Sequence, residues 1–248
     1  MWRLYGEPKD GSKMKYLQSD LLFLDIETVC SVPSYENLNE RMKAQWDRKA
    51  GYIDADASPE ELFRLKGGIY SEFGKIIAIS LGRFYSTGGQ LGIKIKSLFG
   101  HDERSLLEEF KSIVEKYPGN RLMLVAHNGK EFDFPYLCRR MLVNGIRIPE
   151  VLDLSGKKPW EARHMDTLDF WKFGDRKHYT SLELLAALFD IPGSKNDMDG
   201  SQVTEVYYEE KNLARIAEYC SRDVLATASL FLKFNQIPLP EPENILFS

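Results

Sequence analysis

Apolar residues in this chain fall into short runs, and the first run sets the pattern for a sheet. Residues 21–28 read LLFLDIET, an apolar run rich in branched side chains that ends in two acids. A run of this length and composition is typical of a buried central strand. Two later segments, 75–85 and 91–99, also predict strands, and the STGG sequence at 86–89 suits a hairpin turn between them.

A second buried strand is predicted at residues 122–126, followed by a turn at Asn128-Gly129. Patterns typical of helices occupy much of the rest: 35–50, 58–66, a stretch that Asp102 caps and Pro118-Gly119 ends, a stretch entered at Asp133, the sequence LELLAALF, and 212–233.

Capping signals mark two of these helices. Ser58 precedes Pro59 at the first helical position, and Glu61 completes a capping box. The sequence TSLE at 180–183 is a second capping box before LELLAALF, which Pro192-Gly193 closes.

Two segments carry weaker patterns. Residues 148–178 look irregular, and DTLDFW within them is interpreted as a further strand. The C-terminal sequence IPLPEPENILFS is too rich in proline to continue the preceding helix.

The order of elements predicts one α/β domain built on a mixed sheet with helices on its faces. Hairpin-linked strands account for the antiparallel part, and the alternation of strand and helix accounts for the parallel part. The long charged segment 31–74 is interpreted as an insertion beside the first strand, within a single domain that spans residues 1–248.

Composition narrows the class of protein. The 248 residues are 43% hydrophobic and 28% charged, and the formal net charge is −4, which excludes a strongly basic nucleic-acid coat. Three cysteines without C-x-x-C spacing argue against a disulfide framework and against zinc, so a cytoplasmic location is expected. The N-terminal residues lack the apolar core of a signal peptide, and no run approaches the length of a membrane span.

Candidate chemistry begins with Asp25 and Glu27. Alternate residues of a strand share one face, so these carboxylates point the same way, roughly 6–7 Å apart along the strand. The alternative is that both are ordinary solvated acids at a strand end. Two neighbouring carboxylates at the end of a buried strand disfavour each other's ionisation unless a cation neutralises them.

Two other motifs supply matching residues. Tyr219 and Asp223 are four residues apart on the apolar stripe of the last helix, and Asp133 lies at a helix entry. If these elements meet over the strand ends, four carboxylates converge. The natural remedy is divalent metal, and oxygen ligands favour Mg²⁺ or Mn²⁺ over zinc.

The sequences LDIET, HNGKEFDFPYL and YCSRD resemble the three exonuclease motifs of the DEDD, or DnaQ-like, 3′-to-5′ exonuclease superfamily. The tyrosine four residues before the last aspartate resembles the tyrosine subclass, because Glu218 stands where the histidine subclass has its histidine. The wording of the motifs is most similar to the exonuclease domain of family B DNA polymerases. Two departures from that pattern are expected: no polymerase domain within these 248 residues, and a long 31–74 segment.

This resemblance implies a ribonuclease H-like fold, a five-stranded mixed sheet flanked by helices. It also implies a metal-dependent 3′-5′ exonuclease that releases nucleoside monophosphates from single-stranded nucleic acid, with DNA favoured over RNA. Two divalent ions, Mg²⁺ or Mn²⁺, would lie about 4 Å apart at the scissile phosphate. The implied metal ligands are Asp25, Glu27, Asp133 and Asp223, and Tyr219 would orient the attacking water.

Four further residues are candidate substrate contacts: Thr28, His127, Asn128 and Phe132. Three of them have an alternative interpretation. Thr28 is also a good strand residue, Phe132 suits a core position at a helix entry, and His127 suits a satisfied turn residue.

Two basic regions are candidate nucleic-acid contacts. Arg139 and Arg140 either touch phosphate or lie on a solvated helix face. Residues 156–178 interleave lysines and arginines with Trp160, Phe170, Trp171 and Phe173, which indicates either a single-strand track or core aromatics between surface charges.

Rival functions remain open at this point. A 3′-5′ exoribonuclease would use the same metal site, because the chemistry at phosphate does not distinguish the sugars. A module that binds 3′ ends without cutting has little reason to keep four mutually repelling acids. A DNA polymerase or a repair complex is the expected protein partner, and no membrane contact is expected.

Overall fold

Six strands form one mixed sheet in the computed structural model, which describes residues 21–117, 121–158, 161–175, 179–191, 198 and 200–248. The strands are β1 (Leu21–Cys30), β2 (Gly74–Thr87), β3 (Gln90–Phe99), β4 (Met123–Ala126), β5 (Met165–Asp166) and β6 (Ile245–Phe247). Their order is β5-β4-β1-β2-β3-β6. β2 is antiparallel to β1 and β3, whereas the other neighbours pair in parallel.

This sheet confirms the predicted mixed α/β architecture and places the first predicted strand at its centre. The hairpin turn is tighter than predicted: Gly88 and Gly89 alone connect β2 to β3, both at positive φ, where glycine is favoured. The sixth strand, β6, comes from the proline-rich tail and was not predicted. Its three residues pair with the far edge of β3.

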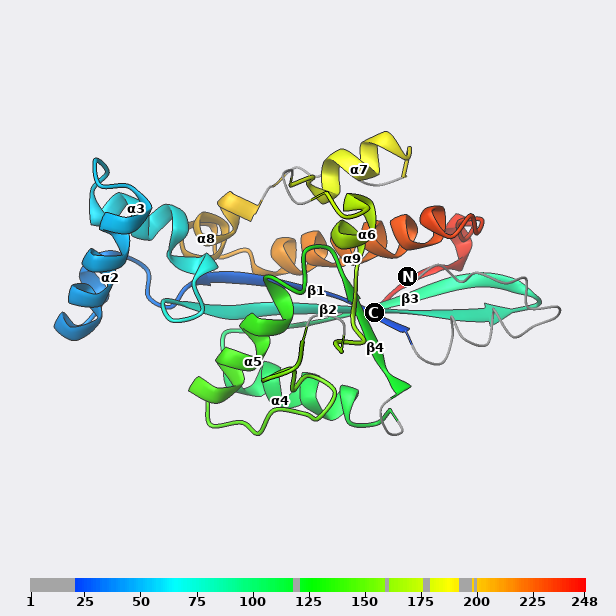
Figure 1. Ribbon diagram of the computed structural model, residues 1–248, viewed down its shortest axis with the longest axis horizontal. Coiled ribbons are helices and arrows are strands. Elements are labelled where there is room, and N and C mark those ends of the chain that lie inside the picture. Colours follow the sequence, from blue (N-terminus) through cyan, green and yellow to red (C-terminus); the bar gives the residue numbers. More distant parts are fainter. Residues whose placement is uncertain (1–20, 118–120, 159–160, 176–178, 192–197, 199) are drawn as a thin grey trace.

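Helices cover both faces of the sheet (Figure 1). On one face α4 (Glu103–Val114) and α5 (Asp133–Val143) pack on Leu22, Leu24 and Ile26 of β1. On the other face α9 (Leu213–Phe234) packs on Leu21 and Phe23. β1 is therefore buried on both sides, as expected for a central strand.

Side chains cap the first turns of α9 and α4, and the cap of α4 was predicted. Asn212 caps α9 by accepting a hydrogen bond from the Arg215 amide, and Asp102 caps α4 through the Arg104 amide. The predicted end of α4 at Pro118-Gly119 lies outside the described residues, and α4 itself ends at Val114. No helix in the described part of the chain is both long and apolar enough to cross a membrane.

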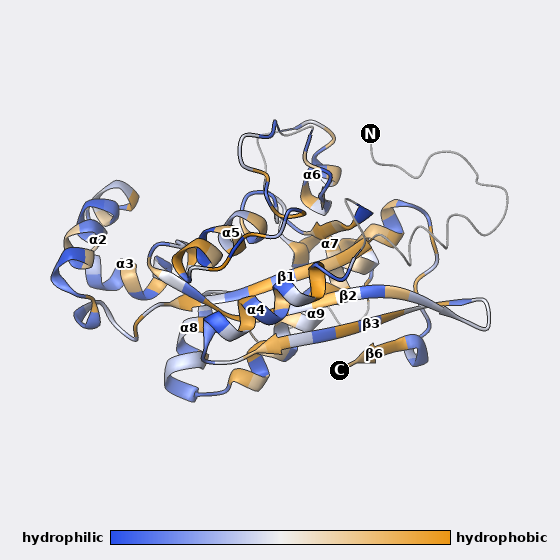
Figure 2. Cartoon of the chain, turned by 90° about the horizontal axis from the view of Figure 1, so that it is seen from below, coloured by the Kyte–Doolittle hydropathy of each residue, from blue (hydrophilic) through white to orange (hydrophobic). Residues whose placement is uncertain are grey.

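The 31–74 segment contains two helices beyond the end of β1, α2 (Glu40–Ile53) and α3 (Pro59–Lys66), with short 3₁₀ turns η1 (Tyr35–Asn37) and η2 (Gly67–Ile69). The segment has a small hydrophobic core of its own, which includes Trp46 and Phe63, and Cys30 of β1 also packs in it. The predicted single helix over 35–50 is wrong, because Asn39 caps α2 and leaves Tyr35–Asn37 as a separate turn. Figure 2 shows that α2 is largely hydrophilic, whereas apolar residues concentrate on the strands.

The prediction of a strand at DTLDFW is also largely wrong. Only Met165–Asp166 pairs, as β5, and Thr167–Lys172 forms helix α6. The Asp166 side chain accepts a hydrogen bond from the Leu168 amide and so caps α6. Helix α7 (Leu182–Leu188) is capped by Ser181, one residue later than Thr180.

A short region before α9 was not predicted as helical. It comprises η4 (Gly200–Gln202), α8 (Val203–Glu205) and a π-helical turn, η5 (Val206–Glu210). Val203, Val206 and Tyr207 pack with Val29 of β1 and Ile77 of β2, which places this region over the same end of the sheet as the 31–74 segment.

Candidate active site

Asp25 and Glu27 continue the face of β1 that packs against α9. Leu21 and Phe23 pack in one apolar cluster with Val224 of α9. Because side chains alternate along a strand, Asp25 and Glu27 point to the same face as these two residues. The pairing register with β2 shifts between Glu27 and Thr28, directly beside the second acid. The side chain of Glu27 is buried, and Asp25 is partly buried.

Cys220 of α9 meets this pair directly. One ligand atom each from Asp25, Glu27 and Cys220 lies within 4.8 Å of the others, and the Cys220 thiol donates to the backbone oxygen of Asp25 at 3.4 Å. Burial raises the pKa of this thiol, and the neighbouring Asp25 and Glu27 carboxylates raise it further. The thiol therefore stays protonated and lacks the charge of a thiolate metal ligand. Sequence reasoning placed Cys220 only on the buried stripe of the helix.

Asp133 reaches the same point from the opposite face of the sheet. It is the first residue of α5, it is buried, and its Oδ1 accepts a hydrogen bond from the Ile26 amide at 3.2 Å. This amide lies between the two acids of β1. Burial raises the pKa of Asp133 to about 7, with Asp166 and Asp223 raising it as well, against the lowering effect of backbone hydrogen bonds.

Tyr219 and Asp223 lie one turn apart on α9, and the Tyr219 hydroxyl is hydrogen-bonded to the Asp223 side chain. Burial raises the pKa of Tyr219 well above its usual range, and the charges of Asp223, Glu27 and Asp25 raise it further. The structure therefore brings the four predicted carboxylates and the tyrosine to one place from β1, α5 and α9.

This cluster has the electrostatics of a cation-binding site. Burial raises the pKa of Asp25 and of Glu27 well above their usual ranges, and charge repulsion among Asp25, Glu27, Asp133 and Asp223 adds to the effect. Oδ2 of Asp25 is buried without a hydrogen-bond partner in the structure. Oxygen atoms that are buried, negatively charged and unpaired fit divalent cations, because a cation neutralises the mutual repulsion.

Thr28 and Phe132 lie beside Glu27. With it they line a pocket of about 170 Å³. The Phe132 ring also packs against Tyr136, with centroids 5.3 Å apart. Thr28 and Phe132 are thus placed next to the carboxylates, and their contact with substrate stays a prediction.

His127 and Asn128 form hydrogen bonds with other residues of the chain. His127 Nε2 lies 2.9 Å from the Thr180 carbonyl, which can only accept, so the neutral ring donates there and Nδ1 accepts from the Thr167 hydroxyl at 2.9 Å. Burial lowers the pKa of His127 and keeps it neutral. Asn128 has φ of 62°, and its backbone N–H donates a hydrogen bond to the Asp166 carboxylate. Both residues shape the turn into α5, and their substrate contacts stay predictions.

Asp166 is the residue that sequence reasoning undervalued. Its buried carboxylate accepts hydrogen bonds from the amides of Asn128, Lys130 and Leu168 at 2.9, 3.1 and 2.9 Å. Three amides around one carboxylate fix the turn that precedes Asp133. An aspartate directly before the sequence TLDF is a helix-capping signal, and it could have indicated this role.

Both predictions for Arg140, a phosphate contact and a position on a solvated helix face, are wrong. Its side chain is buried, and two of its nitrogens donate to the Glu103 carboxylate at 2.8 and 2.6 Å. A third donates to the Ser71 carbonyl. It therefore neither contacts phosphate nor lies on a solvated face, whereas Arg139 is exposed.

The aromatic residues of the 156–178 stretch divide into two groups. Phe170 and Trp171 stack on Phe234 of α9, with centroids 5.0 and 6.2 Å apart, so they are core aromatics. Phe173 is 73% exposed. Trp160, Arg176 and Lys177 lie outside the described residues.

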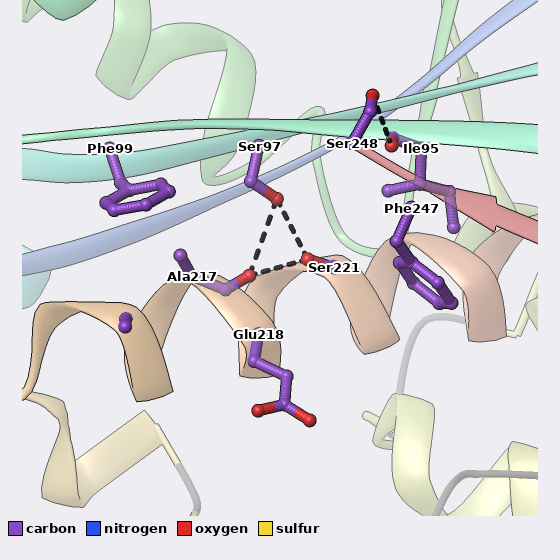
Figure 3. A pocket seen from close by; sticks show the side chains of 9 residues that line it. Ile95, Ser97, Phe99, Ala217, Glu218, Ser221, Phe247 and Ser248 are labelled. Atoms are coloured by element: carbon purple, nitrogen blue, oxygen red, sulfur yellow. Dashed lines mark hydrogen bonds between the residues drawn. The ribbon is translucent and has the colours of Figure 1, made fainter.

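A larger groove of about 420 Å³ lies between α9 and the β3–β6 edge, and it is a separate feature (Figure 3). Phe99 and Phe247 flank it, and the hydroxyls of Ser97 and Ser221 are hydrogen-bonded at 2.8 Å on its floor. None of the four converging carboxylates lines it. Size alone therefore does not locate the chemistry in this molecule.

Comparison with protein families gives an independent result. The model of a family described as predicted 3′-5′ exonuclease related to the exonuclease domain of PolB matches residues 69–238. This range contains Asp133, Tyr219 and Asp223. Asp25 and Glu27 precede it, and the structure places them against Cys220, which lies within the matched range.

Individual relatives are DNA polymerases. DNA polymerase 1 of Pyrococcus abyssi is 25% identical over 146 residues, 53% of this chain and 18% of the polymerase. A DNA polymerase of Thermococcus litoralis is 22% identical over 147 residues, 54% of this chain and 8% of the polymerase. The chain thus spans less than a fifth of the length of these curated relatives.

A solved structure confirms the fold. The family B DNA polymerase from the hyperthermophilic archaeon Pyrobaculum calidifontis matches with a TM-score of 0.51, over 86% of this chain and 24% of that chain, at 16% identity. At this identity the likeness shows the fold alone. It agrees with the ribonuclease H-like class that the sequence motifs implied.

Proposed function

This chain belongs to the family of predicted 3′-5′ exonucleases related to the exonuclease domain of PolB, and from that premise we propose that it is a metal-dependent enzyme that removes nucleoside monophosphates one at a time from the 3′ end of single-stranded nucleic acid. The observation that carries the proposal is the convergence of Asp25, Glu27, Asp133 and Asp223, with raised carboxyl pKa values and an unpaired buried oxygen on Asp25.

The carboxylates are suited to hold Mg²⁺ or Mn²⁺, two ions in the mechanism that we favour. Bound there, such ions stabilise the negative charge that develops on a phosphodiester and make water a better nucleophile. Asp25 and Glu27 come from β1 and Asp223 from α9, and the charges of the three carboxylates interact. The hydrogen bond from Ile26 to Asp133 fixes the fourth carboxylate relative to the β1 acids.

Tyr219 is proposed to position the attacking water. Its raised pKa keeps the hydroxyl protonated at neutral pH, so it acts as a hydrogen-bonding group and not as a general base. Its hydrogen bond to Asp223 fixes the hydroxyl beside the ion-binding carboxylates. Water oriented there would attack the phosphorus and release the 3′-terminal nucleotide as a monophosphate.

DNA is the favoured substrate, because the relatives described above are named as DNA polymerases. A polymerase or a repair complex is the favoured partner on the same ground. The phosphate chemistry itself would operate on RNA as well, so the first experiment includes both sugars.

The test uses 5′-labelled oligonucleotides of one sequence as DNA and as RNA, incubated with Mg²⁺, Mn²⁺ or chelator and resolved on a gel. We expect a ladder that shortens from the 3′ end, is lost in chelator, and is lost in Asp25→Ala while that variant stays folded. Glu115→Ala, which removes an exposed acid at the end of α4, is the matched control and should keep wild-type activity.

Tyr219→Phe separates positioning from binding. We expect a lower kcat with little change in KM, because the aromatic ring remains and only the hydroxyl is lost. A wild-type rate in this variant would remove Tyr219 from the mechanism. Absence of any ladder, with retained binding to 3′ ends, would favour a recognition module and overturn the proposed activity.

A further inference from the structure

The pocket beside Glu27 has a wall that the exonuclease motifs do not provide. Its lining residues come from β1, from the turn before α5, from the 200–204 region and from the 31–74 segment. They are Ile26, Glu27, Thr28, Phe132, Gly200, Ser201, Thr204, Leu65, Gly68 and Ile69. The last three belong to α3 and η2.

Leu65 and Ile69 present unusual surfaces. Their side chains are 48% and 51% exposed, although both are large and aliphatic. They lie four residues apart, at the end of α3 and in the turn that follows, and both line the pocket. Exposed aliphatic side chains that face a pocket next to a catalytic carboxylate indicate a contact with substrate.

The position of this wall is fixed by close packing on β1. A Cβ atom on Gly67 would lie 2.9 Å from Cys30 Sγ, and one on Gly68 would lie 3.1 Å from the Val29 backbone. The Tyr136 hydroxyl of α5 donates to the Gly68 carbonyl at 2.7 Å. η2 therefore sits directly against the strand that carries Glu27, and Ile69 is held in place before any ligand binds.

We propose, on the basis of the exonuclease function above, that the 31–74 segment completes the binding site for the 3′-terminal nucleobase, with Leu65 and Ile69 packing on the base. The occupant follows from three features of the pocket. It adjoins Glu27, so whatever fills it lies next to the site of cleavage.

The lining chemistry selects the neutral part of a nucleotide. Among the described residues that line the pocket there is no lysine or arginine, and the Glu27 carboxylate would repel a phosphate. Leu65, Ile69 and Phe132 offer apolar contact to the faces of a base, and Ser201 and Thr204 place hydroxyl-bearing side chains at its edge.

The pocket volume agrees with one base. About 170 Å³ is less than the roughly 300–1,000 Å³ of pockets that hold drug-sized ligands. The pocket thus suits a single ring system and not a dinucleotide. Because the wall is pre-formed, its contacts contribute to affinity without an ordering cost.

The test measures binding of 5′-labelled DNA by fluorescence anisotropy, with Ca²⁺ as the divalent cation. One oligonucleotide ends in a normal nucleotide and its partner ends in an abasic nucleotide at the same 3′ position. The protein variants are wild type, the double variant Leu65→Ala with Ile69→Ala, and Tyr52→Ala as a control. Tyr52 is 93% exposed on α2 of the same segment and does not line the pocket.

We expect wild type to bind the normal end about tenfold more tightly than the abasic end. In the double variant the normal end should lose about tenfold in affinity and the abasic end almost nothing, so the preference disappears. Tyr52→Ala should keep it. Thermal unfolding of each variant confirms that the exposed substitutions leave the fold intact.

The inference is overturned if the double variant weakens both ends equally, if it weakens neither, or if wild type shows no preference for the normal end. The proposed exonuclease function fails separately, through absence of 3′ shortening in Mg²⁺ and Mn²⁺. The anisotropy assay needs no cleavage. If the protein binds the terminal base but does not cut, the base-binding role of Leu65 and Ile69 would stand and the proposed exonuclease function would be refuted.

Discussion

Asp133 carries a charge that the fold makes costly, and replacing it should stabilise the protein. Its pKa is raised to about 7 from 3.8, first of all by burial. A raised folded-state pKa means that the stabilisation is fully present below about pH 3.8 and is lost as the pH rises through 7. Each pKa unit corresponds to about 1.4 kcal/mol, so the loss above pH 7 is about 4 kcal/mol.

Asp133→Asn removes the charge and retains the shape. The amide oxygen can still accept the hydrogen bond from the Ile26 amide, and asparagine does not titrate. We expect the variant to gain about 4 kcal/mol of unfolding free energy over wild type at pH 8 and about 2 kcal/mol at pH 5, while cleavage is lost. The higher stability and the lost activity have the same cause, a carboxylate that the active site needs and the fold does not.

The assay is urea denaturation in chelator at the two pH values, because divalent ions would neutralise the same carboxylates. Glu131→Gln is the control, since Glu131 is an exposed acid in the turn before α5 and should change stability by less than about 0.5 kcal/mol. An Asp133→Asn variant that is less stable than wild type at pH 8, or whose gain does not increase from pH 5 to pH 8, would refute the electrostatic reasoning.

Three further predictions concern metal binding, a buried ion pair and a buried histidine. Mg²⁺ at a hundredfold excess over its Kd should stabilise wild type by about 2.7 kcal/mol in thermal unfolding, and Asp25→Asn should abolish this response; an equal response in that variant would place the ion elsewhere. Arg140→Met should cost about 3–5 kcal/mol in urea denaturation, because the buried Glu103 carboxylate would lose its cationic partner, whereas Arg139→Met at an exposed site should cost little; similar losses would contradict the ion pair. Burial lowers the pKa of His164 to about 4, so its unfolded form takes up a proton below about pH 6.5 while the native form does not. Wild type should therefore lose about 2 kcal/mol relative to His164→Gln between pH 7 and pH 5, and parallel pH profiles would show that His164 titrates normally.

Local chemistry made several elements predictable. The apolar run of β1 and the caps of α3 and α4 depend on residues a few positions apart, so the sequence alone indicates them. The same local rules failed at DTLDFW, where aromatic residues favour a strand by composition. There the Asp166 cap and the stacking of Phe170 and Trp171 on Phe234 stabilise a helix instead.

The candidate residues of the site could be predicted from the sequence, whereas their arrangement in space could not. Spacing on β1 and α9 gave the pairs Asp25 with Glu27 and Tyr219 with Asp223, because each pair lies within one element. The contact of Asp133 with the Ile26 amide joins residues 107 positions apart, and no local pattern encodes it.

The sequence by itself therefore indicated which carboxylates are candidates for the chemistry, through the motifs that resemble the exonuclease family. It also indicated most of the elements that hold them, through periodicity and capping within short windows. Only the tertiary structure decided that Arg140 forms a buried ion pair with Glu103 and that Cys220 lies against Asp25. It alone also decided that Leu65 and Ile69 line the pocket beside Glu27. The physical reason is that burial, and with it the pKa values and the pocket walls, arises from contacts between segments distant in the chain.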